Sequence, residues 1–289
     1  RLEWEDGTRH FGKLYATDKL AELGKQDHVI LALKAHQLCE ILADIDHLLD
    51  AHTTLVTMQN GIPFWYFHRH GGEYEGRVIE SVDPGGAIVA KLGIERIIGS
   101  VVYPASVLAE PGFIHHVESN RFTFGEPDGS SSERLGGLAA AMRDAGFKCP
   151  VIPDIRNEIW LKLWGNLTFN PISALSHATL EELCTYPPTR DLAVQMMTEA
   201  QNVAERLGVA FRVGIERRIA GAQAVGAHKT SMLQDVEAGR ALELDALVGS
   251  VVEIGRLVGV PTPHIDAVYA CTKLLDRTLR RQKGMLAVR

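Results

Sequence analysis

One cation and two amides recur at a spacing of four residues near the middle of the chain: Lys162, Asn166 and Asn170. The segment around them is predicted to be helical, so each step of four adds only about 40° of drift and the three side chains share one stripe. Apolar residues, among them Trp164 and Phe169, fill much of the remaining circumference, as in a buried helix. Because a buried cation needs partners, the stripe indicates either a binding site or a polar network inside a core.

Lys162 is the first candidate for proton transfer. A lysine that is partly desolvated near a cleft has a lowered pKa and can exchange a proton near neutral pH. The competing interpretation is a side chain that extends from an apolar helix to solvent. Asn166 and Asn170 could hold a carboxylate or a hydroxyl group, or bond to a neighbouring helix. Asn170 also precedes Pro171, which favours a helix end there.

A second group of polar residues is predicted on a helix over residues 231–255. Ser231 and Gln234 match a capping box, which is a structural role, although a capping serine can also hold an anion. Ser231 and Glu243 are separated by three steps of four, so we expect them along one side of this helix. Glu243 could face inward or pair with Arg240 at the surface, and the spacing favours the surface pair.

The third group follows two predicted strands. Lys34 and Gln37 come after an apolar run at residues 28–33, and Asn60 comes after the next run at 54–58. The carboxyl ends of parallel strands line the ligand crevice of open α/β sheets. The Asn-Gly pair that begins at Asn60 is equally a turn signal that needs no ligand, so both interpretations stay open.

The elements that must position these residues change character near residue 150. Before that point strands and helices alternate, and the apolar runs at 28–33 and 54–58 are typical of strands buried on both faces of a parallel sheet. Further strands are predicted at 2–5, 14–16, 97–102, 113–117, 121–125 and 148–152, with helices at 35–49 and 132–145. After that point helical periods dominate, at 158–169, 189–207, 231–255 and 263–281. The basic stretch 277–289 is expected to fray.

This pattern predicts an α/β domain over residues 1–153 and an all-α domain over residues 154–289, with a cleft between them that suits a small molecule. The net charge of -6 gives no basic footprint for nucleic acid. No apolar run approaches the roughly 20 residues that span a bilayer and no secretory leader is visible, so a cytoplasmic protein is expected. Four scattered cysteines indicate free thiols, and no metal-binding spacing occurs.

Taken together, these residues resemble the ketopantoate reductase (2-dehydropantoate 2-reductase) family. The similar pieces occur in the family's order over nearly the whole chain: residues 29–37, 59–61, Lys162 with Asn166, Asn170 and Pro171, residues 231–235 with Arg240 and Glu243, and residues 259–263. The resemblance implies a Rossmann-type parallel-sheet domain followed by a helical domain, with NADPH and a 2-oxo acid between them. It leaves a homodimer open.

The resemblance also implies a role for each polar residue of the second half. Lys162 corresponds to the catalytic general acid, which protonates the substrate oxygen as hydride reaches the ketone carbon. Glu243 corresponds to an acidic residue near the substrate and the nicotinamide ribose. Asn166, Asn170 and Ser231 correspond to residues that hold the carboxylate and hydroxyl groups of the substrate.

On the cofactor side, Asn60 corresponds to a contact with the nicotinamide, and Lys34 and Gln37 to contacts with the adenosine. The family's GxGxxG turn, which cradles the pyrophosphate, does not occur in this sequence, so we expect an N-terminally incomplete Rossmann domain whose first βαβ unit lies upstream of Arg1. The basic residue that reads the 2′-phosphate is also missing. NADPH rather than NADH therefore follows from the family alone.

The predicted function is NADPH-dependent reduction of ketopantoate to pantoate in pantothenate biosynthesis. A different 2-oxo acid, or a non-catalytic binding or dimerising remnant, is the alternative. A 6-phosphogluconate- or glycerol-3-phosphate-type dehydrogenase would need Arg or Lys clustered beside Lys162, and the sequence shows none there. The aromatic segment 61–67 could pack in the core or shape the pocket, and the core is favoured.

Overall fold

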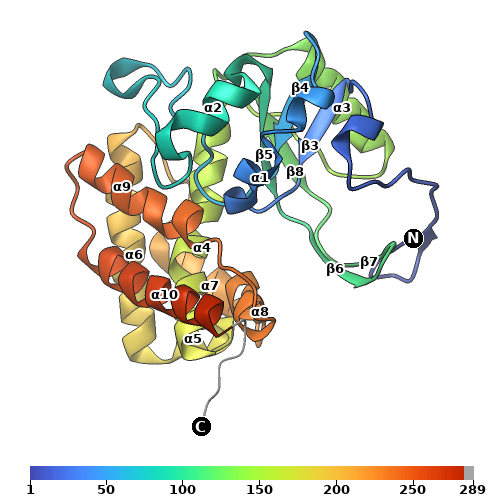
Figure 1. Cartoon of the computed structure of the whole chain (residues 1–289). Coiled ribbons are helices and arrows are strands. Elements are labelled where there is room, and N and C mark those ends of the chain that lie inside the picture. The colour runs from blue at the N-terminus through green and yellow to red at the C-terminus, as the bar shows by residue number, and fades with distance from the viewer. Residues whose placement is uncertain (283–289) are drawn as a thin grey trace.

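The computed structural model describes residues 1–282. It consists of an α/β part and a helical part, which the long helix α4 (Ile155–Ser176) joins (Figure 1). Residues 283–289, which belong to the stretch predicted to fray, lie outside the described residues. None of the helices in the described part of the chain is long and apolar enough to cross a membrane.

The main sheet has four strands in the order β3-β4-β5-β8: β3 (His28–Leu31), β4 (Thr54–Thr57), β5 (Ile97–Val102) and β8 (Phe122–Gly125). The first three are parallel, with Ile30 opposite Val56 and Val56 opposite Ile98, and β8 is antiparallel to β5. β4 is buried throughout, as predicted for a strand covered on both faces. The same prediction is wrong for β3, because β3 is an edge strand and Ile30 is 46% exposed.

A second, smaller sheet lies beside the N-terminus in the order β2-β1-β7-β6 (Figure 1). Its strands are β1 (Leu2–Glu3), β2 (Arg9–His10), β6 (Ala105–Glu110) and β7 (Phe113–Glu118). The prediction of a strand at 14–16 is wrong, since the strand that pairs with β1 comes earlier, and β6 was not predicted. The strand predicted at 148–152 is reduced to two isolated bridges.

The predicted helix at 35–49 is wrong as one element. It is a series of single turns: a 3-10 turn at Ala35–Gln37, α1 (Leu38–Ile41) and a 3-10 turn at Ile45–His47. The helix predicted at 132–145 is present as α3 (Glu133–Asp144), where Ser132 caps the first turn by accepting from the Leu135 N–H. The unpredicted elements of this part are α2 (Ala87–Leu92) and 3-10 turns at Leu20–Glu22, Gly72–Tyr74, Pro84–Gly86 and Ile94–Arg96.

The helical part is a bundle around α4. Its other helices are α5 (Leu180–Thr185), α6 (Pro187–Arg206), α7 (Ile215–Ala224), α8 (Ser231–Glu237), α9 (Ser250–Leu257) and α10 (Pro263–Arg281), with a π-helical turn at Asp245–Gly249. α10 has the bounds that were predicted, whereas α5 and α7 were not predicted. The single helix predicted over 231–255 is wrong, because the chain turns at Gly239, whose φ is +65°.

α4 also differs from its prediction, because it continues past Pro171 to Ser176. A proline inside a helix removes one backbone donor and usually kinks or ends the helix. Here the residues from Leu167 to Ala174 are all buried, so packing on every side offsets that loss. The helix instead ends at His177, which adopts a left-handed conformation with φ of 59°.

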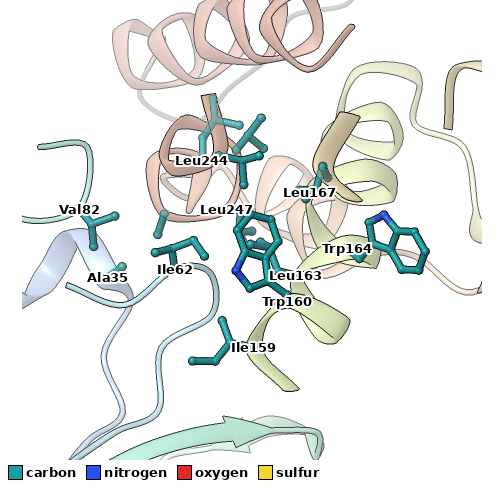
Figure 2. Close-up of a cluster of buried hydrophobic side chains, with 14 of the residues drawn as sticks. Ala35, Ile62, Val82, Ile159, Trp160, Leu163, Trp164, Leu167, Leu244 and Leu247 are labelled. Atoms are coloured by element: carbon teal, nitrogen blue, oxygen red, sulfur yellow. The ribbon is translucent and has the colours of Figure 1, made fainter. Parts of the chain in front are cut away.

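The two parts share one hydrophobic core. Figure 2 shows Trp160, Leu163 and Leu167 of α4 in one cluster with Ile62 of the α/β part and Leu244 near the π-helical turn. The aromatic segment 61–67 belongs to this core, which confirms the favoured prediction, and Trp160 donates to the Tyr66 hydroxyl at 2.7 Å. A second cluster packs α3 against the opposite face of the sheet, so the sheet is covered on both sides.

Candidate active site

Lys162 points from α4 toward the carboxyl ends of two parallel strands. Its Nζ donates to Oδ1 of Asn60, after β4, at 2.7 Å, and to the carbonyl oxygen of Val102, the last residue of β5. Burial lowers the pKa of Lys162 from its usual 10.5 to about 8, and the carboxylate of Glu243 opposes this shift. The amine is therefore held in the cleft between α4 and the strand ends, where it can release a proton near neutral pH.

A pocket lies in front of this amine, between α4 and the ends of β4 and β5. Asn60, Lys162 and Asn166 line it, as do Trp65 and Ser100, which the sequence did not single out. Trp65 is fixed by donating from its indole N–H to the Thr57 hydroxyl at 2.9 Å. The hydroxyl of Ser100 is buried and has no hydrogen-bond partner among the residues described. Polar groups that lack partners in a cleft are available to a ligand.

A second pocket adjoins the first, and Asn166 lines both. Asn170 and Ser231 also line it, and Nδ2 of Asn170 donates to the Ser231 hydroxyl at 3.4 Å. The structure therefore brings the three residues predicted to hold the substrate to neighbouring positions on α4 and α8. The predicted capping box is wrong, because the N-cap of α8 is Thr230, which accepts from the Leu233 N–H.

Glu243 lies outside α8, in the segment that leads to the π-helical turn. Its carboxylate accepts from the backbone N–H of Ala35 at 3.2 Å, at the start of the turn after β3. The favoured surface pair with Arg240 is wrong, since Arg240 pairs with Asp235 at 2.9 Å. Because Gly239 ends the helical path, the predicted alignment of Ser231 and Glu243 along one helix is also wrong.

Lys34 and Gln37 lie close to the same segment. Nζ of Lys34 pairs with the carboxylate of Asp235 at 2.5 Å and donates to the carbonyl of Ala241 at 3.3 Å. The side-chain oxygen of Gln37 accepts from the backbone N–H of Lys34 at 3.0 Å, which caps the turn. The two contacts of Lys34 connect the α/β part to the helical part beside the site, whereas the contact of Gln37 is local.

Comparison with known proteins agrees with this arrangement. Residues 1–129 match the model of the family "Ketopantoate reductase PanE/ApbA", and residues 154–276 match that of its C-terminal domain. A 2-dehydropantoate 2-reductase from Mesorhizobium japonicum is 56% identical over 271 residues, which are 94% of this chain and 83% of the relative. The chain belongs to the ketopantoate reductase family. Membership confirms the predicted fold class, a Rossmann-type sheet domain with a helical C-terminal domain.

Solved structures of relatives share the fold of this ketopantoate reductase family member. A putative ketopantoate reductase from Ralstonia solanacearum MolK2 superposes with a TM-score of 0.91 at 39% identity, over 96% of this chain and 85% of that one. A 2-dehydropantoate 2-reductase from Geobacter metallireducens has a TM-score of 0.80 at 26% identity, over 94% and 85%. A D-mandelate dehydrogenase solved with NADH and anilino(oxo)acetate superposes at 0.73 with 21% identity, over 89% and 77%, which shows the fold alone.

The first pocket carries polar groups that suit the carboxamide at the nicotinamide end of the family's cofactor. The amide of Asn60 and the buried hydroxyl of Ser100, which has no partner among residues 1–282, match the donors and acceptors of a carboxamide. Gly61 has a φ of +91°, and a Cβ there would overlap the carbonyl oxygen of Ala246, so the loop after β4 lies directly against the helical part. The pyrophosphate end has no corresponding GxGxxG turn in the sequence.

Two arginines lie near Lys162, and one of them, Arg218, comes from a helix that was not predicted. Arg218 of α7 lines a further pocket together with Lys162 and Arg121, so the expectation that no Arg lies beside Lys162 is wrong. Arg121 is neutralised by Glu158 at 2.7 Å. The apolar spacing of Ile215 and Ile219 within α7 is the sequence pattern that indicates this helix.

Proposed function

We propose that this chain reduces ketopantoate to pantoate, with NADPH as the hydride donor. The observation that carries the proposal is the largely buried amine of Lys162, held by Asn60 and Val102 at the ends of two parallel strands in a ketopantoate reductase fold. Its pKa of about 8 suits an acid that works near neutral pH.

Lys162 is the proposed general acid. NADPH, when bound, supplies the hydride that the carbonyl carbon accepts. Two N–H groups of the ammonium donate to Asn60 and to the carbonyl of Val102, so the third is left for the substrate oxygen. As negative charge develops on that oxygen, the ammonium stabilises the charge and donates a proton from Nζ. With a pKa of about 8, roughly 90% of the amine is protonated at pH 7.

The remaining residues are proposed to bind and orient. Glu243 keeps Lys162 protonated through its charge and lies on the cofactor side of the site. Asn166, Asn170 and Ser231 hold the carboxylate and hydroxyl groups of the substrate, which is consistent with their shared pocket. The proposed cofactor contacts are Asn60 at the nicotinamide and Lys34 and Gln37 at the adenosine.

The division into a dinucleotide-binding domain at 1–153 and a substrate domain at 154–289 is part of the proposal. So are a cytoplasmic location and a homodimer. A relative from Staphylococcus aureus that shares the fold at 21% identity is described as a dimeric ketopantoate reductase, which supports the dimer. Size-exclusion chromatography with light scattering tests it.

Replacing Lys162 with alanine tests the proposed function. In the protein expressed from its full reading frame, we expect Lys162→Ala to lower kcat for ketopantoate by about 10²- to 10⁴-fold. NADPH binding, followed by tryptophan fluorescence, should stay close to that of the native protein. The matched control is Lys148→Ala, which removes an exposed lysine and should leave turnover unchanged.

Three outcomes distinguish the alternatives. Unchanged turnover in Lys162→Ala would refute the role of this residue. A higher kcat/KM for another branched 2-oxo acid than for ketopantoate would assign a different substrate to the same chemistry. Binding of NADPH without reduction of any 2-oxo acid would identify a non-catalytic remnant.

A further inference from the structure

Arg218 is the most unusual side chain around the site. It extends from α7 toward α4 and lines two pockets, one with Asn166, Asn170 and Ser231 and the other with Lys162. The guanidinium is therefore the cation that faces both the proposed proton donor and the proposed substrate-binding amides. The sequence prediction assigned it no role.

The guanidinium of Arg218 has no anionic partner within residues 1–282. No ion pair and no side-chain hydrogen bond joins it to any of these residues, and its Nε is buried without a partner. Burial lowers the pKa of Arg218, which reflects the cost of keeping this charge away from water. The neighbouring Arg121 differs, because Glu158 pairs with it. A half-buried cation that has no anionic partner among the described residues is available to an anionic ligand that enters these pockets.

Gly165 provides a second, independent observation. It lies on α4 between Lys162 and Asn166, and a Cβ at this position would collide with Nη2 of Arg218. Glycine inside a helix is less favourable than alanine by roughly 0.5–1 kcal/mol. Gly165 therefore makes α4 less stable than alanine would, at the position where the guanidinium of Arg218 lies against the helix backbone.

We propose that Arg218 binds the carboxylate of the 2-oxo acid and selects anionic substrates over neutral ketones. This inference rests on the proposed function. In a 2-oxo acid the carboxylate is bonded to the carbon that accepts hydride, so its anchor must lie beside the proton donor, as Arg218 lies beside Lys162. The planar fork of a guanidinium matches the two oxygens of a carboxylate. Asn170 and Ser231 are then left for the hydroxyl group.

The test compares ketopantoate with its uncharged lactone. In Arg218→Gln we expect KM for ketopantoate to rise about 10- to 100-fold, with a smaller change in kcat and little change for the lactone. Arg218→Lys should recover part of the loss, because it restores the charge without the fork. Gly165→Ala should act in the same direction by displacing the guanidinium. The control is Arg212→Gln, an exposed arginine just before α7, which should not change either value.

A binding measurement keeps the test independent of turnover. Calorimetric titration with pantoate should show weaker binding to Arg218→Gln than to the native protein, whether or not reduction occurs. Equal affinity for pantoate, or an unchanged preference for acid over lactone, would overturn the assignment. Tighter binding of glycerol 3-phosphate than of pantoate would assign Arg218 to a phosphate and would also overturn it. If pantoate binding depends on Arg218 but no 2-oxo acid is reduced, only the proposed function fails.

Discussion

The pH dependence of reduction offers a direct test of how Lys162 works. Because the protonated amine is the active form, kcat/KM should be constant at low pH and fall as the pH rises through the pKa of about 8. With an unperturbed lysine, kcat/KM would instead fall only near pH 10.5. Burial lowers this pKa and the carboxylate of Glu243 raises it. Glu243→Gln therefore removes the negative charge that stabilises the protonated amine.

The size of the expected change follows from this balance. Loss of one nearby opposite charge lowers the pKa of a buried amine by about 1 unit. At pH 8 the protonated fraction would then fall from about one half to roughly one tenth, which makes kcat/KM relative to its low-pH value about fivefold smaller. Glutamine can still accept from the backbone N–H of Ala35, so the local fold is retained.

The assay is NADPH oxidation at subsaturating ketopantoate between pH 6 and 10, for which kcat/KM reports the free enzyme. We compare the pH at which kcat/KM falls to half of its low-pH value. The absolute kcat/KM is not compared, because Glu243 is also proposed to contact the substrate or cofactor. Glu237→Gln is the control, since this exposed carboxylate of α8 pairs with Lys229 and does not contribute to the pKa shift of Lys162. A native limb near 10.5, or a limb that does not move downward in Glu243→Gln, would refute the reasoning.

Two further predictions concern how the parts are joined. Gly61→Ala should lower the free energy of unfolding by about 2–4 kcal/mol, because the new Cβ would overlap the carbonyl of Ala246. Gly112→Ala is the control: this glycine also has a positive φ, +78°, but open space around it, so the loss should be only about 1 kcal/mol. Equal losses in urea unfolding would show that backbone strain alone matters. Asp235→Asn should cost about 2 kcal/mol, because it removes the charge that pairs with Lys34. Glu237→Gln at the exposed pair should cost less than about 1 kcal/mol, and similar values for both would contradict a structural bridge.

Elements with a strong, well-bounded apolar pattern were predictable from the sequence. β5 and α10 have the bounds that were predicted. β5 is an apolar run interrupted only by Gly99 and Ser100, and α10 has a long helical pattern of apolar residues that begins at Pro263. The breaks were not predictable, because they depend on tertiary packing or on a single backbone angle. α4 continues past Pro171 only because its surroundings are buried, and the helix after Ser231 ends at Gly239 through a positive φ.

The same distinction applies to the site. The stripe of Lys162, Asn166 and Asn170 follows from spacing on one helix, and the approach of Asn60 follows from the rule for strand ends. Arg218 could not be found in this way, because α7 is short and its position against Gly165 exists only in three dimensions. Glu243 was placed on the wrong element because the break at Gly239 was missed.

α4 carries both the proposed proton donor and a large part of the hydrophobic core, and this limits how the chain can evolve. Trp160 and Trp164 are fully buried on the helix that also carries Lys162, so any core substitution that shifts the helix also shifts the amine from Asn60 and Val102. A displacement of about 1 Å at a reacting group can cost about 10²-fold in rate. Mutations in this core are therefore selected for turnover as well as for stability. We expect new substrate preferences to arise instead through the side chains of α7 and α8 that line the pockets, because these can change without altering the core around α4.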